Sequence, residues 1–127
     1  MIRVLLVDDE AIVREGLRMR LAQVPDIRIV GEAMTGAEAF AQVQQLQPDV
    51  VLMDLSLPDM DAIAAIRLLR TAHRASAVVI LSLQDDAVIR TRVQAAGAEA
   101  LMSKYEGATA ILPQSGTSVN ADAPSGS

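Results

Sequence analysis

The chain has 127 residues, of which 51% are hydrophobic, and this length suits one domain with a sizeable core. Its formal net charge is -5, and no run of lysine or arginine is present to hold nucleic acid or an anionic membrane, so we expect no direct contact with either. With no cysteine, no secretory leader and no apolar run of membrane-spanning length, the sequence predicts a cytoplasmic protein without disulfides.

Aliphatic runs alternate with segments of helical periodicity over the first hundred residues. Ile2–Val7 is aliphatic apart from Arg3 and is followed by three acidic residues, as in a strand buried on both faces. The spacing of the next apolar residues predicts an amphipathic helix over 10–23 that ends before Pro25. The alternation continues with strands predicted at 27–33, 50–53, 77–81 and 98–102 and helices at 35–47, 61–72 and 85–96.

Two local signals support these helices: Thr35 and Glu38 form a capping box, and Gly97 is placed to close the last helix. Strands that alternate with helices of this length predict a doubly wound α/β fold with a parallel sheet, because parallel neighbours need crossover connections. After Lys104 the pattern weakens. Residues 106–112 suffice for a short helix at most, and 113–127 have the composition of a disordered linker or tail, so we place the domain at 1–112.

Polar side chains cluster where the predicted strands end. Asp8 and Asp9 follow the first strand, Asp54 ends the third, Ser82 follows the fourth and Lys104 the fifth. In open α/β sheets the ligand site lies outside the carboxyl ends of the strands, so we expect these side chains to converge there.

Each of these residues also has an ordinary structural interpretation. Asp8 or Asp9 can cap the first helix, Ser82 with Asp85 can cap the fourth, and Asp54 can form a turn. Taken together, the caps explain the pattern poorly, because one helix needs only one cap and crowded carboxylates repel one another unless a cation or a chemical task compensates.

The compensating cation that fits oxygen ligands is Mg²⁺, and no arrangement of histidine and cysteine indicates zinc. With Mg²⁺ present, one carboxylate can attack a phosphoryl group to form an acyl phosphate. Lys104, the only lysine of the chain, and the hydroxyl of Ser82 would then hold the remaining phosphoryl oxygens.

The sequence resembles the receiver domains of bacterial two-component response regulators over residues 2–104. The resemblance rests on Val-Asp-Asp-Glu at 7–10, Met-Asp-Leu-Ser-Leu-Pro-Asp-Met-Asp at 53–61, Leu-Ser at 81–82, Gly-Ala at 97–98 and Lys104. It implies a flavodoxin-like five-stranded sheet of order 2-1-3-4-5. The segments 81–86 and 102–104 are similar to receivers of the NarL/FixJ type, which are joined to helix-turn-helix transcription factors.

The resemblance also implies roles for single residues. Asp54 matches the phosphoacceptor and Asp8 and Asp9 match the metal-binding pair. The backbone carbonyl of Ser56 matches a further Mg²⁺ ligand. The remaining matches are Ser82 and Lys104, as the switch hydroxyl and the lysine that pairs with the phosphoryl group, and Ser56 and Gln84, at positions that tune the phosphoryl lifetime.

The implied function is a signalling switch rather than an enzyme. The domain would take a phosphoryl group from a histidine kinase or phosphotransfer protein, catalysing its own phosphorylation and dephosphorylation, and would control a transcriptional output that this chain lacks. The alternative is a pseudo-receiver that binds partners without phosphoryl transfer. A phosphotransferase of the haloacid-dehalogenase type is disfavoured, because Asp54-Leu55-Ser56 lacks the second aspartate.

Two departures from the family pattern stand out. Leu101 occupies the switch position where many receivers carry an aromatic residue. The last helix is short or missing, so either the chain is an excised fragment or another chain covers the exposed area, for which we predict a homodimer through residues 85–112.

Overall fold

The computed structural model describes residues 1–83 and 86–104. Within them lie five strands and four helices: β1 (Ile2–Val7), α1 (Ala11–Leu21), β2 (Ile27–Ala33), α2 (Gly36–Leu46), β3 (Val50–Asp54), α3 (Ala62–Ala72), β4 (Ala77–Ser82), α4 (Ala87–Ala96) and β5 (Ala100–Ser103). All strand pairs are parallel and the sheet order is β2-β1-β3-β4-β5. The doubly wound α/β fold and the order implied by the family resemblance are therefore confirmed.

The predicted and observed bounds differ most around α4. The helix predicted from residue 85 begins at Ala87, because Asp86 is its N-cap and accepts hydrogen bonds from the backbone N–H groups of Val88 and Ile89. The strand predicted from residue 98 begins at Ala100, because the N–H of Ala98 still bonds back to the carbonyl of Val93 in α4. Gly97, with φ 121°, closes α4 as predicted.

The capping box at the start of α2 is present in a shifted form. The N–H of Glu38 donates to Thr35 Oγ1 at 3.0 Å, as predicted, while the Glu38 carboxylate accepts from the N–H of Met34 at 2.9 Å, one residue before the cap.

The predictions for Gln84, for a short helix at 106–112 and for a tail at 113–127 lie outside the described residues, as does the end of the predicted dimer surface.

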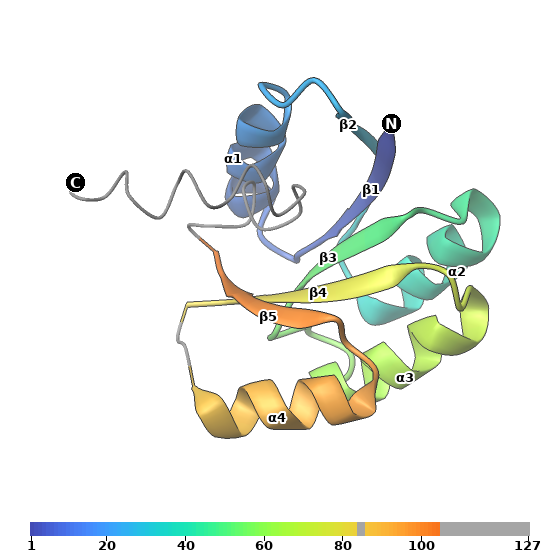
Figure 1. Ribbon diagram of the computed structural model, residues 1–127, viewed down its shortest axis with the longest axis vertical. Coiled ribbons are helices and arrows are strands. Elements are labelled where there is room, and N and C mark those ends of the chain that lie inside the picture. Colours follow the sequence, from blue (N-terminus) through green and yellow to red (C-terminus); the bar gives the residue numbers. More distant parts are fainter. Residues whose placement is uncertain (84–85, 105–127) are drawn as a thin grey trace.

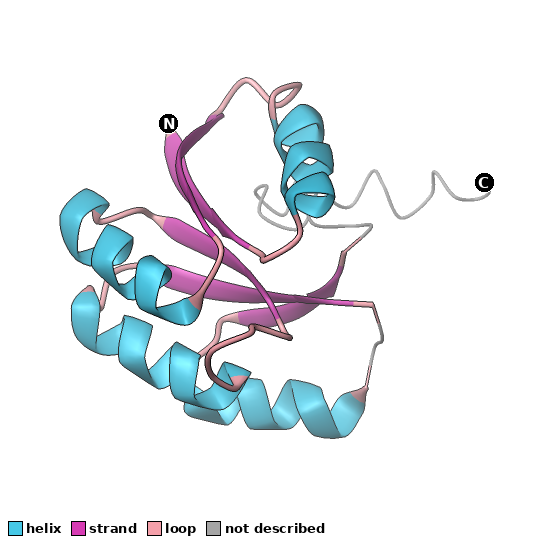
Figure 2. Ribbon diagram, turned by 180° about the vertical axis from the view of Figure 1, so that it is seen from behind, coloured by secondary structure: helices cyan, strands magenta, loops and turns pink. Residues whose placement is uncertain are grey.

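The helices are distributed unequally over the two faces of the sheet. Figure 1 shows α1 on one face and α2, α3 and α4 on the other, and the reverse view in Figure 2 shows the same arrangement. Each strand buries side chains on both faces: Leu5 and Val7 of β1 pack in the core with α2 and α3, while Val4 and Leu6 pack in the core with α1. This two-sided burial explains why the central strands read as continuous aliphatic runs.

A β-bulge interrupts this alternation in β2. Val4 pairs with Ile29 and the next residue, Leu5, pairs with Gly31, so Val30 is the extra residue. Beyond the bulge, Glu32 reaches Arg14 and Arg18 of α1, and Gly31 lies against α2, where a Cβ atom would come within 2.4 Å of Gln42 Oε1.

Candidate functional site

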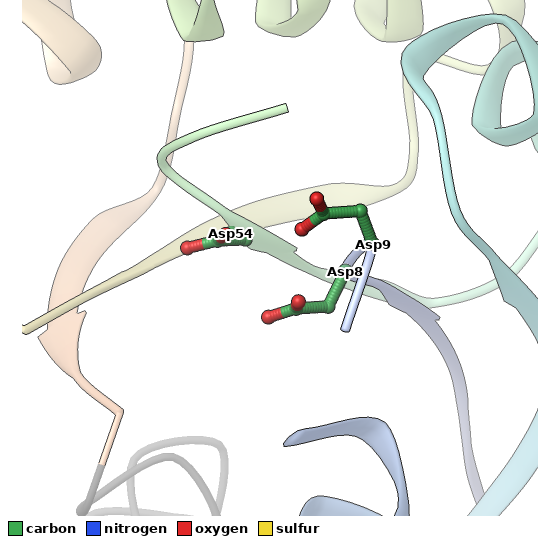
Figure 3. Close-up of side chains that lie close together, drawn as sticks. All are labelled: Asp8, Asp9 and Asp54. Carbon is green, nitrogen blue, oxygen red and sulfur yellow. The ribbon is translucent and has the colours of Figure 1, made fainter. Parts of the chain in front are cut away.

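The side chains predicted to converge do meet at the carboxyl edge of the sheet. In β3, Leu52 faces the α1 core and Met53 the opposite core, so the alternation directs Asp54 toward the α1 face. The same alternation continued past β1 and β5 directs Asp8 and Lys104 to that face too. Figure 3 shows the carboxylates of Asp8, Asp9 and Asp54 extending from the ends of β1 and β3 into one common space.

The ammonium of Lys104 forms ion pairs with two of the three carboxylates. Lys104 Nζ lies 3.1 Å from Asp54 Oδ1 and 3.5 Å from Asp8 Oδ2, and its side chain is only 12% exposed. The other oxygen of Asp8 accepts the N–H of Glu10 at 2.9 Å. Asp8 Oδ2 is buried and accepts no hydrogen bond within the described part of the chain, and it forms an ion pair with the Lys104 ammonium at 3.5 Å. A buried carboxylate oxygen in this state is an energetic cost in the metal-free protein.

The titration of the pair reflects this crowding. Burial raises the pKa of Asp54 above its usual range, and the negative charge of Asp8 adds to the effect, while hydrogen bonds from Lys104 and the Ser56 backbone oppose it. Burial alone would lower the pKa of Lys104, but the two carboxylates outweigh it and hold that pKa above its usual value. Lys104 therefore stays charged at neutral pH, and one cation balances two buried anions.

The carboxylates open into a pocket of about 530 Å³. Its wall includes Asp9, Ser56, Ser82 and Leu83, and Asp54 and Lys104 also line it. Ser82 is 5% exposed, whereas Leu83 is 67% exposed at the rim. Every described residue that the sequence predicts for the site thus lies in or directly behind this pocket, except Leu101.

The carboxylate set fits a hard divalent cation. One oxygen from each of Asp8, Asp9 and Asp54 can be chosen so that the three lie within 4.8 Å of one another. Asp8 and Asp54 are buried and Asp9 is exposed toward the pocket. Oxygen ligands gathered at an open face are what Mg²⁺ requires, because this ion retains several waters. Asp8 Oδ2 is buried and accepts no hydrogen bond from the described residues, and a bound cation would offset the cost of burying it.

The alternative interpretation of these residues as helix caps does not hold. The N-cap of α1 is Glu10, whose side chain makes no capping hydrogen bond, and the N-cap of α4 is Asp86. Asp54 lies inside β3 as its last residue, not in a turn. Ser82 is the last residue of β4 and is not the cap of α4.

Leu101 lies in a different layer from the pocket. It is 1% exposed and packs in the core between the sheet and α2, α3 and α4. The position that carries an aromatic side chain in many relatives is therefore filled here by a fixed aliphatic side chain of that core.

Two polar contacts at this edge escaped the sequence prediction. Arg14 Nη1 donates to the carbonyl oxygen of Asp8 at 2.6 Å while its Nε pairs with Glu32 at 3.0 Å. Asp59, in the loop after β3, accepts from two N–H groups of α2. The contacts of Arg14 with Glu32 and of Asp59 with α2 join residues 18 or more apart in sequence, and the bond from Arg14 to Asp8 spans six residues. None follows a local sequence pattern, although Asp59 does lie inside the motif at 53–61.

Residues 4–114 match the family described as the response regulator receiver domain. The chain belongs to this family. It is 38% identical over 107 residues to the response regulator GacA of Pseudomonas viridiflava, a match that covers 84% of this chain and 50% of that protein. The chain spans about half the length of the curated response regulators that it matches.

The solved structures that are similar to this chain include receivers of the NarL and LuxR type. The signal receiver domain of NarL from Mycobacterium tuberculosis has a TM-score of 0.80 at 29% identity, covering 87% of this chain and 92% of that one. A LuxR-family response regulator from Aurantimonas sp. SI85-9A1 has a TM-score of 0.78 at 34% identity, covering 82% and 74%. The resemblance to receivers of the NarL type is confirmed at the level of fold and family.

Proposed function

We propose that this domain is a phosphoacceptor switch in which Asp54 takes a phosphoryl group in a Mg²⁺-dependent reaction. The observation that carries the proposal is the pairing of Asp54 with Lys104 at 3.1 Å on the wall of an open pocket, beside an Asp8 oxygen that accepts no hydrogen bond from the described residues. A structural ion pair does not need two further aspartates nearby, whereas phosphoryl transfer needs a nucleophile, a cation site and a group to hold the transferred oxygens.

Asp8, Asp9 and Asp54 would hold the metal ion, with the backbone carbonyl of Ser56 as a further ligand. Bound Mg²⁺ would neutralise negative charge on the phosphoryl oxygens. Arg14 holds the backbone carbonyl of Asp8, so the metal-binding pair is positioned from α1.

In the transfer step an oxygen of Asp54 attacks phosphorus and a new O–P bond forms. The P–N bond of a phosphohistidine, or the P–O bond to acetate in acetyl phosphate, breaks, and the leaving group takes the electron pair. Lys104 Nζ, already beside Asp54 Oδ1, moves its contact to a phosphoryl oxygen. The Ser82 hydroxyl, on the wall of the same pocket, donates to another. Ser56 and Gln84 would tune how long the phosphoryl group persists.

The donor would be a histidine kinase or a phosphotransfer protein in the cytoplasm, and the output would be transcriptional. The receiver itself would contact no DNA, and a further domain would carry that activity. Among the described residues no helix is long and apolar enough to cross a membrane. The homodimer through residues 85–112 stays a prediction; it requires a mass of two chains in light scattering at high concentration.

Incubation with Mg²⁺ and acetyl phosphate tests the proposal. The intact mass should increase by one phosphoryl group, and the increase should disappear with Asp54→Asn and with a chelator. The matched control is Asp49→Asn, an aspartate at the opposite edge of the sheet, which should be phosphorylated like the wild type. A wild-type protein that gains no mass, or a phosphorylated Asp54→Asn variant, contradicts the proposal; the first result would favour a pseudo-receiver.

A further inference from the structure

The loop after the proposed phosphoacceptor is fastened to a helix distant in sequence. Asp59 Oδ1 accepts the N–H of Gly36 at 2.8 Å and Asp59 Oδ2 accepts the N–H of Ala37 at 3.0 Å. Both N–H groups belong to the first turn of α2, where helical N–H groups have no partner within the helix. One carboxylate of the loop therefore closes the end of α2 from outside, in addition to the helix's own cap, Thr35.

A second contact joins the same two segments. Met60 packs against Gly36 so closely that a Cβ atom at this glycine would lie 2.6 Å from Met60 Sδ and 2.8 Å from its Cγ. Any larger residue at position 36 would require the Met60 side chain to move. The loop thus meets α2 through a pair of hydrogen bonds and a close contact that depends on glycine.

The loop that these contacts hold carries the proposed metal ligand. Leu55 continues the sheet by donating its N–H to the carbonyl of Leu81, and Ser56 forms an isolated antiparallel bridge with Asp61. The chain between Ser56 and Asp61 consequently folds back on itself, and Asp59 lies within that return. Asp59 is thus joined through this turn to Ser56, which lines the pocket.

The electrostatics favour this contact in its charged form. The hydrogen bond from Gly36 is the main reason that the pKa of Asp59 lies below its usual range, with Ala37 contributing in the same direction. A carboxylate is also favoured at the positive end of the helix dipole. The Asp59 side chain is exposed, but Gly36 is buried, so removing the carboxylate leaves the N–H of Gly36 without this acceptor.

We propose that Asp59 is a positioning residue: by tying the loop 55–61 to the first turn of α2, it places the Ser56 carbonyl for Mg²⁺. This inference rests on the proposed function of the pocket. It makes metal affinity depend on a contact between the loop and α2 that touches neither the metal nor the phosphoryl group. Outer contacts of this kind typically change metal affinity by about 10-fold or more.

The test compares three variants that alter the first turn of α2 differently. Asp59→Ala removes the hydrogen bonds, and Gly36→Ala displaces Met60 while adding a better helix former. Thr35→Ala removes the cap of the same helix without touching the loop. Isothermal titration with Mg²⁺ alone gives the affinity, and phosphorylation by acetyl phosphate over a range of Mg²⁺ concentrations gives the half-saturating concentration and the maximal rate.

We expect Asp59→Ala and Gly36→Ala to weaken Mg²⁺ binding by about 10-fold. Saturating Mg²⁺ should restore most of their phosphorylation rate, and Thr35→Ala should match the wild type in both measurements. Asp59→Asn, which keeps one acceptor oxygen, should fall between.

Equal Mg²⁺ affinity in Asp59→Ala and Thr35→Ala overturns the inference, as does a rate that is lower at every Mg²⁺ concentration with unchanged affinity. The titration with metal alone needs no phosphoryl transfer. If the wild type binds Mg²⁺ and is not phosphorylated, the proposed function fails while the role of Asp59 can still be measured.

Discussion

The parallel strands all begin at one edge of the sheet and end at the other, and the polar groups at these two edges are paired in different ways. At the edge where the strands begin, Asp49 Oδ2 accepts the N–H of Arg3 at 2.8 Å and the Asp49 backbone bonds to Arg3 and Ala77. Ser76, which is 1% exposed, donates its hydroxyl to the carbonyl of Pro48, and its Oγ also contacts His73 Nδ1 at 2.9 Å. Among the described residues, no buried side-chain nitrogen or oxygen at this edge lacks a hydrogen-bond partner.

At the edge where the strands end, the groups are left mismatched. Asp8, Asp9 and Asp54 gather around one ammonium, and one buried oxygen of Asp8 accepts no hydrogen bond among the described residues. The paired groups of the first edge stabilise the folded chain by themselves, whereas the second edge retains, among the described residues, a buried carboxylate oxygen without a hydrogen bond. This difference, rather than the presence of acidic residues, marks the second edge as the candidate functional one.

The largest expected effect is a loss of folding stability that leaves phosphorylation unchanged. Leu101→Ala leaves a cavity in the core beside α4 and should lower the free energy of unfolding by about 3 kcal/mol, measured by urea denaturation. Its phosphorylation at a temperature where the protein is folded should match the wild type, since Leu101 does not line the pocket. Leu101→Met should lose less than about 1.5 kcal/mol. Lost phosphorylation in the folded variant would mean that this position does belong to the site.

Ser76→Ala removes a buried hydroxyl at the edge where the strands begin. The carbonyl of Pro48 and the ring of His73 lose their partner in a buried place, which should lower the free energy of unfolding by about 2 kcal/mol. The control is Thr71→Ala, an exposed hydroxyl that donates to the carbonyl of Leu68 and should matter little. Mg²⁺ affinity and phosphorylation should not change; a changed affinity would show that the two edges are coupled.

Asp54→Asn should have the opposite sign and stabilise the metal-free protein. Burial and Asp8 raise the pKa of this carboxyl, so its ionised form at neutral pH costs stability that a neutral amide of the same shape does not. Thermal unfolding with a chelator measures the effect, and added Mg²⁺ should reduce the advantage over the wild type by stabilising the wild type more. Asp49→Asn, at the matched edge, should not stabilise. A lower melting temperature for Asp54→Asn would contradict the description of this edge as mismatched.

The smallest expected effect concerns Glu32, whose carboxylate pairs with Arg14 and Arg18. Burial alone would raise the pKa of Glu32, but Arg18 and Arg14 outweigh it and hold that pKa below the ordinary value of 4.5. Its contribution to stability is therefore present above that value and is lost as the pH falls through the lower pKa of the folded state. Glu32→Gln should cost a few tenths of a kcal/mol near neutral pH and nothing in strong acid, as measured by urea denaturation at several pH values. A constant difference at all pH values would exclude this ionic origin.

Much of the fold was predictable because its periodic signals are long. The runs at Ile2–Val7 and 77–81 could only be buried strands, and their alternation with helices determined the class; the strand order came from the family resemblance. The ends of the helices were less predictable. Asp86 is the N-cap of α4, but the sequence has a second aspartate, Asp85, directly before it, and residue type alone does not choose between them.

The site divides in the same way. Asp8, Asp54 and Lys104 each follow or end a strand, and parallel strands bring their ends together, so their meeting could be expected. Arg14 and Asp59 could not, because each spans two elements and the choice among acceptors depends on three-dimensional distance alone. Which polar atom would lack a partner depends on the same distances.

The bulge at Val30 gives β2 one residue more than its pairing with β1 uses. Exchanging Val30 for another apolar residue would leave the pairing on either side intact. Deleting it would join Ile29 directly to Gly31 and restore an unbroken alternation, with Glu32 still toward α1 and Gly31 still toward α2. Arg14 and Arg18 would keep their shared partner, and α2 would keep the flat surface on which Gln42 lies. In a deletion scan of this strand, Val30 should therefore be the residue whose loss is tolerated best.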